Sequence, residues 1–169
     1  MEIKKVAVYK FAELSDSAKG KAVAYFRDRF EYPWFDEAMG SIKAFVKGLH
    51  GDVMDWSIGD GVYRSFVRTT LDESFFTDLE LSAFNRDHMP TGYCLDATLW
   101  GVFYDEFKKT GDGFYAYQQA IESALCEISS DVESHYSDES VIENIEINEY
   151  EFKADGSPFF SRVRESATA

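Results

Sequence analysis

The chain is short of cysteine and proline, and these two shortages narrow its class. Its 169 residues include 2 cysteines, Cys94 and Cys126, which lie in no CxxC or Cys/His spacing. We therefore expect neither a disulfide framework nor a zinc site, and we predict two free, buried thiols. With only 3 prolines, no low-complexity tract and no internal repeat, the sequence shows no linker between domains.

Long hydrophobic runs are also missing. No stretch approaches the roughly 18 apolar residues that a membrane-spanning helix needs, and the apolar run near the N-terminus is too short for a signal peptide. We therefore expect no membrane partner and a location in the cytoplasm.

Positive charge is scarce, and unevenly so. The chain has 17 Lys and Arg against 31 Asp and Glu, a net charge of −14. The net charge is +2 over residues 1–50, −7 over residues 51–121 and −9 over residues 122–169. Such a surface repels the phosphate backbone, so we expect no direct binding of nucleic acid. It attracts basic protein surfaces, although solubility alone also explains an acidic surface.

Aromatic residues, by contrast, are plentiful. With 15 Phe, 10 Tyr and 3 Trp and a hydrophobic content of 45%, the sequence is typical of a packed globule. We predict a single α+β domain over residues 1–160, with a small, mainly antiparallel sheet packed against three to four helices. A flexible C-terminal tail is expected at 161–169.

Apolar periodicity places four helices. Ser15 and Ser137 are credible N-caps, and Pro33 suits the first turn of another helix. The clearest helix follows Gly113, with Phe114, Tyr117, Ile121, Leu125, Ile128 and Val132 as its core stripe.

Alternation and turn signals place the strands. We predict strands at 3–11, 95–104 and 149–153, the last followed by a turn at Asp155 and Gly156, and a β-hairpin whose strands flank Gly59, Asp60 and Gly61. Residues 71–90 fit a strand and a helix equally well.

No arrangement of residues indicates catalysis. His50, His88 and His135 have no partner at helical spacing, and the glycines at 59–61 and 111–113 do not complete a phosphate-binding loop. Sequence spacing cannot show the burial that separates the pKa values of two carboxyl groups. We predict no catalytic residue, no metal and no cofactor, and hence no enzyme. A hidden carboxylate cluster that binds Mg²⁺ is the alternative, and metal titration would reveal it.

The acidic C-terminal third is the most distinctive feature. Residues 122–155 hold 11 carboxylates and one lysine, so repulsion is not relieved by local pairs. Glu139, Glu143 and Glu146 follow one outward line of the predicted helix, and their spacing is comparable with that of phosphates along a nucleic-acid strand. The predicted partner-binding residues are Glu122, Glu127, Asp131, Glu133, Asp138, Glu139, Glu143 and Glu146.

Three sequence blocks carry a resemblance. The first block is residues 8–15 followed by Ala18, Lys19, Lys21, Ala22, Tyr32 and Trp34, the second is residues 55–61, and the third is residues 148–152 with Asp155 and Gly156. Together they resemble a family of small, mostly uncharacterised phage and prophage proteins. Residues 71–110 depart from the pattern. The resemblance implies a phage origin and a host cytoplasm. By analogy of class, small acidic phage proteins often antagonise host defence, as anti-CRISPR and antirestriction proteins do.

Two hypotheses follow from these observations. In the first, the chain is a non-enzymatic inhibitor, monomer or homodimer, whose acidic surface mimics nucleic acid and occupies the basic nucleic-acid-binding groove of a host defence protein. In the second, it is an accessory or antitoxin-like domain that binds a partner through the aromatic helices of residues 1–50, including Trp34 and Phe35.

Overall fold

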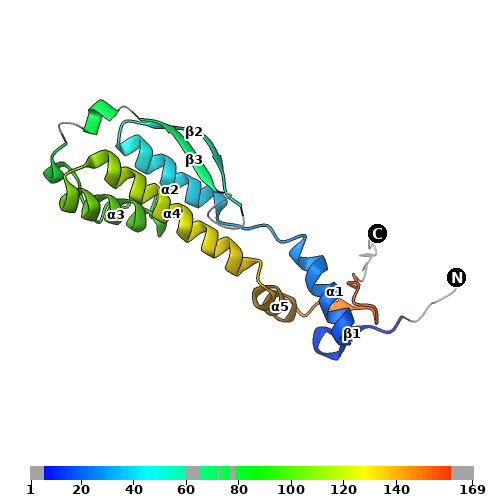
Figure 1. The fold of residues 1–169 in the computed structure, drawn as a ribbon. Helices are drawn as coiled ribbons and strands as arrows, with labels where there is room; N and C mark the ends of the chain where they lie inside the picture. Colours follow the sequence, from blue (N-terminus) through cyan, green and yellow to red (C-terminus); the bar gives the residue numbers. More distant parts are fainter. Residues whose placement is uncertain (1–5, 60–64, 72, 77–78, 161–169) are drawn as a thin grey trace, which may run out of the picture. The chain divides into compact units, whose positions relative to one another are not determined.

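The computed structural model describes residues 6–59, 65–71, 73–76 and 79–160 (Figure 1). The chain forms two compact units. The terminal unit combines Met1–Glu31 with His135–Ala169, and the central unit is Tyr32–Ser134. The predicted α+β class is confirmed, since helices accompany two antiparallel sheets of two strands each. A single domain over 1–160 stays a prediction, and the predicted tail lies outside the described residues.

The terminal unit is built from both ends of the chain. Strand β1 (Tyr9–Lys10) pairs antiparallel with β4 (Glu151–Phe152), so that Tyr9 lies opposite Phe152. A 3₁₀ turn, η1 (Phe11–Glu13), leads to helix α1 (Asp16–Arg27), and helix α5 (Asp138–Ile147) packs on α1. The predicted strand at 3–11 is therefore much shorter among the described residues, because only Tyr9 and Lys10 pair with β4 and Phe11 already starts a turn.

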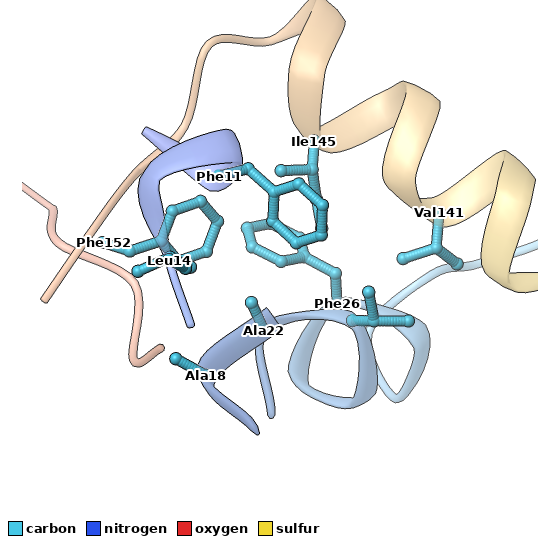
Figure 2. Close-up of a cluster of buried hydrophobic side chains, with 9 residues drawn as sticks. Phe11, Leu14, Ala18, Ala22, Phe26, Val141, Ile145 and Phe152 are labelled. Carbon is cyan, nitrogen blue, oxygen red and sulfur yellow. The ribbon is translucent and has the colours of Figure 1, made fainter. Parts of the chain in front are cut away.

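A hydrophobic cluster holds these elements together. Figure 2 shows Phe26 of α1 and Val141 and Ile145 of α5 turned toward Phe11 and Phe152. All five side chains are buried. Each such burial contributes about 1.5–3 kcal/mol relative to an exposed side chain, so the cluster is the main stabilising contact of this unit.

Both predicted serine caps of this unit are confirmed. The Ser15 hydroxyl accepts a hydrogen bond from the Ala18 amide at the start of α1, at 3.4 Å. The Ser137 hydroxyl does the same for the Ser140 amide of α5, at 3.2 Å. Capping depends only on neighbouring residues, which is why the sequence alone located these helix starts.

The turn after β4 brings the backbone very close to α1. Gly156 has a φ of +85°, and a Cβ placed there would overlap the carbonyl oxygen of Ala18 and lie 2.9 Å from its carbonyl carbon. The predicted turn at Asp155 and Gly156 is confirmed, and only glycine satisfies both the left-handed backbone and the close approach.

Helices and a hairpin form the central unit. Helix α2 (Phe35–Gly48) is followed by the antiparallel strands β2 (Asp52–Ser57) and β3 (Phe66–Thr70), and then by helices α3 (Leu95–Thr110) and α4 (Gly113–His135). The hairpin lies along α2 (Figure 1). The predicted hairpin is confirmed, although most of its expected turn lies outside the described residues. β2 carries an irregularity in register between Val53 and Asp55.

Phe45 lies at the centre of this unit. It is fully buried, and its ring centroid is 4.9 Å from that of Trp100 on α3 and 6.1 Å from that of Tyr117 on α4. The Tyr117 hydroxyl and the Thr69 hydroxyl of β3 lie 2.7 Å apart, within hydrogen-bonding distance. Aromatic packing therefore connects α2, α3 and α4, and a hydrogen bond ties the hairpin to α4.

The predicted strand at 95–104 is wrong, because these residues form helix α3. Alternate apolar residues suggested the strand, but Leu95, Leu99, Phe103 and Phe107 also recur every four residues, and all four are buried. Asp96 supports the helix start, since its Oδ2 accepts the amides of Thr91 and Gly92 at 2.8 and 2.9 Å. The ambiguous stretch 71–90 contains the short 3₁₀ turns η3 (Glu73–Phe76) and η4 (Leu81–Ala83).

Candidate functional site

Three glutamates form a row on the outer face of α5. Val141 and Ile145 anchor the opposite face of the helix in the terminal core, which leaves Glu139, Glu143 and Glu146 exposed. Spacings of four and three residues place the three within about 60° of one another around the helix. Together with Ile142 they line an open depression of about 550 Å³. We call these three residues the glutamate row.

Cations neutralise the acids on either side of the row. Asp138 forms an ion pair with Arg27, whose Nε also donates a hydrogen bond to the Tyr136 carbonyl at 3.0 Å. The Lys10 ammonium lies 4.0 Å from a Glu149 carboxylate oxygen and 3.8 Å from one of Glu151. Within the described residues, no ion pair involves the glutamate row itself. The set of carboxylates without a counter-ion is therefore smaller than the sequence analysis predicted.

The three glutamates of the row have opposing effects on the stability of α5. Glu139 and Glu143 are four residues apart, where like charges destabilise a helix by roughly 0.2–0.5 kcal/mol. Glu146 lies in the last turn, where the helix dipole favours a cation by about 0.3–1 kcal/mol. Lysine would suit the helix dipole better at position 146, whereas Glu139 lies in the first turn, where the dipole favours a carboxylate. The stability of α5 therefore accounts for Glu139 but not for Glu143 or Glu146.

The predicted acids on α4 belong to the central unit and do not form a row. Successive residues turn by 100°, so Glu122 and Glu133 lie on one flank of the helix while Glu127 and Asp131 lie on the other. Neutral groups of the same unit contact two of them. The Thr98 hydroxyl of α3 donates to Glu127 at 2.5 Å, and the Tyr32 hydroxyl donates to Asp131 at 3.0 Å.

Tyr32 is buried beside this carboxylate. Burial, together with the hydrogen bond to Asp131 and its negative charge, raises the pKa of the Tyr32 phenol far above its ordinary value of 10.0. Burial likewise raises the pKa of Tyr117. The folded central unit therefore keeps these two hydroxyls protonated in mildly alkaline solution.

We expect stability to fall in alkaline solution because of Tyr32. Above pH 10 the unfolded chain loses the phenolic proton while the folded chain retains it, so the free energy of unfolding falls by up to about 1.4 kcal/mol per pH unit. Urea unfolding between pH 7 and 11 measures this slope. The Tyr32→Phe variant should lose less stability above pH 10, while its curve runs parallel to the wild-type curve from pH 7 to 9. Equal slopes above pH 10 would contradict the assignment.

Two site features escaped the sequence analysis. The counter-ions Lys10 and Arg27 are more than 100 residues away from the acids that they neutralise, and no local pattern pairs them. The prediction that Cys94 and Cys126 are buried is wrong, because both are exposed. Cys94 immediately precedes α3, and Cys126 lies next to Glu127 on the solvent side of α4.

No described part of the chain gathers three His, Cys, Asp or Glu side chains in a way that would hold a metal ion. None of the described helices has both the length and the apolar character to cross a bilayer. Comparisons with protein-family models, with curated proteins and with solved structures each returned no match.

Proposed function

We propose that the chain is a non-enzymatic inhibitor that presents the glutamate row of α5 to the basic nucleic-acid-binding groove of another protein. The carrying observation is that these three carboxylates are exposed and have no cationic partner within the described residues, while the acids on both sides of them do. A partner rich in Lys and Arg would supply the missing counter-ions.

The dimensions of the row support this form of mimicry. Glu139 and Glu146 are seven residues apart, which is about 10 Å along the helix axis. One nucleic-acid strand advances about 3.4 Å per phosphate, so the row covers the length of about three nucleotides. Ile147, 72% exposed, adds an apolar contact beside it. Because helix stability does not account for Glu143 and Glu146, we attribute the row to binding.

The resemblance to phage and prophage proteins suggests the setting. We propose that the inhibitor acts in the cytoplasm of a bacterial host on a defence protein, as anti-CRISPR or antirestriction proteins do. The acids of α4, together with Asp138, are secondary in this proposal. Asp138 is already paired with Arg27, and the α4 carboxylates are divided between two flanks.

A binding domain that uses its aromatic residues is the second candidate. One observation favours it, because Trp34 is 49% exposed at the start of α2. Other aromatic residues of that stretch offer less surface, since Phe35 is half-buried and Tyr32, Phe26 and Phe45 are buried. We rank this candidate below the glutamate row.

The decisive test reverses the charge of the row. The triple variant Glu139→Lys, Glu143→Lys, Glu146→Lys should no longer displace DNA from the partner recovered by affinity capture from host lysate. The affinity of the wild-type protein should fall as the salt concentration rises. Lysine at position 146 suits the helix dipole, lysine at position 139 opposes it, and the repulsion between positions 139 and 143 remains, so we expect the free energy of unfolding to change by less than about 1 kcal/mol. Urea unfolding of the variant checks that it is folded, so that loss of displacement can be assigned to the reversed charges.

A matched control separates a site from bulk charge. The triple variant Glu122→Lys, Glu127→Lys, Glu133→Lys changes the net charge by the same amount and should retain most of the inhibition. Equal loss in both variants would mean that only net charge matters. Undiminished inhibition by the α5 variant, or recovery of nucleic acid as the sole partner, would refute the proposal.

A further inference from the structure

A second depression lies between α1 and α5 of the terminal unit. It has a volume of about 320 Å³, within the range of small-molecule sites. Among its described lining residues, Phe11, Val23 and Ile142 form an apolar floor, and the charged residues Lys19, Arg27 and Asp138 form the rim. Gly20 is the remaining lining residue. It shares Ile142 with the depression at the glutamate row, but none of the three glutamates lines it, so an inference about this pocket does not depend on the proposed inhibition.

The rim of this pocket is cationic although the chain as a whole is acidic. Arg27 and Asp138 neutralise each other in an ion pair. Lys19 is the other cation of the rim, and within the described residues it pairs with no carboxylate. Its ammonium lies 6.0 Å from the centroid of the Phe11 ring. The pocket therefore offers one uncompensated positive charge above an apolar floor, which fits a ligand with one negative charge and an apolar body.

Gly20 is an exposed lining residue that adds no side chain to the pocket. It lies inside α1, where glycine is less favourable than alanine, and a Cβ placed there would meet no heavy atom within 4 Å. Neither backbone conformation nor close packing requires glycine here. At Gly156, in contrast, both do. An occupant that packs closely against α1 would explain the missing side chain.

We infer that this pocket binds a small aliphatic carboxylate, with its carboxylate at Lys19 and its hydrocarbon chain against Phe11, Val23 and Ile142. The positive charge of Lys19 favours a carboxylate headgroup. The hydrocarbon chain of the ligand packs on the apolar floor and in the space beside Gly20. Binding is reversible and involves no covalent step.

Octanoate is the probe that tests this assignment, with binding followed by backbone-amide NMR shifts of the full-length protein. Saturable shifts are expected in α1 and α5. Hexanoate should bind about 15-fold more weakly, since each buried methylene contributes about a fourfold change in affinity. Lys19→Gln should weaken octanoate by about fivefold and leave 1-octanol unchanged. Lys21→Gln, on the same helix but outside the described lining, is the matched control.

Bulk at Gly20 gives a second, independent readout. Gly20→Leu should remove saturable binding, whereas Ala24→Leu, which places the same side chain at an exposed position of α1 outside the described lining, should not. Gly20→Ala should raise the melting temperature through helix propensity and still weaken octanoate binding. Absence of saturable shifts in the wild type, binding that persists in Gly20→Leu, or equal losses in the two lysine variants would each overturn the proposal.

Discussion

Replacing Gly156 by alanine is expected to destabilise the terminal unit by about 2–5 kcal/mol. The residue has a φ of +85°, which costs a residue with a side chain roughly 1–2 kcal/mol, and the new methyl group would collide with the backbone of Ala18. Backbone atoms in the first turn of α1 cannot move aside as a flexible side chain does. Hydrogen exchange of the α1 and α5 amides measures the loss.

Gly111→Ala is the matched control for this prediction. Gly111 has a similar φ of +71°, but a Cβ there meets no heavy atom within 4 Å. Only the backbone strain applies, so we expect a cost of about 1–2 kcal/mol. If both variants lost the same stability, the close approach of Gly156 to α1 would contribute nothing.

Phe45→Ala should destabilise the central unit by about 3–5 kcal/mol. The side chain is fully buried among Trp100, Phe103 and Tyr117, so its removal leaves a cavity that three other aromatic rings cannot fill without repacking. Urea unfolding followed by tryptophan fluorescence reports this loss, because Trp34, Trp56 and Trp100 all lie in the central unit.

An exposed phenylalanine supplies the comparison. Phe66 on β3 is 43% exposed, and the same truncation there should cost less than about 1 kcal/mol. A Phe45 variant no less stable than the Phe66 variant would contradict the placement of Phe45 in the core.

Local signals in the sequence were sufficient for much of the fold. Ser15 and Ser137 cap helices through their own neighbours, and the turn at Gly156 follows from adjacent residues. α3 was misassigned because Leu95, Leu99 and Phe103 satisfy the two-residue and four-residue repeats alike. The surroundings decide between them, since residues on one face of α3 pack on α2 and its partners.

The candidate site was predictable only in part. The spacing of Glu139, Glu143 and Glu146 on a capped helix was enough to place them on one face. The pairing of Asp138 with Arg27, and of Lys10 with Glu149 and Glu151, depends on contacts between opposite ends of the chain. Sequence distance hides such contacts, so the predicted acidic surface was broader than the set of unpaired carboxylates.

The construction of the terminal unit from both chain ends bears on biosynthesis. α1 leaves the ribosome more than 100 residues before α5, and until then the apolar side chains of Ala22 and Phe26 have no α5 partner. The central unit is synthesised in between and is complete first. A chain that terminates before β4 would lack the strand that completes the terminal unit. In such a truncated product, α5 and its glutamate row should be held in place less firmly.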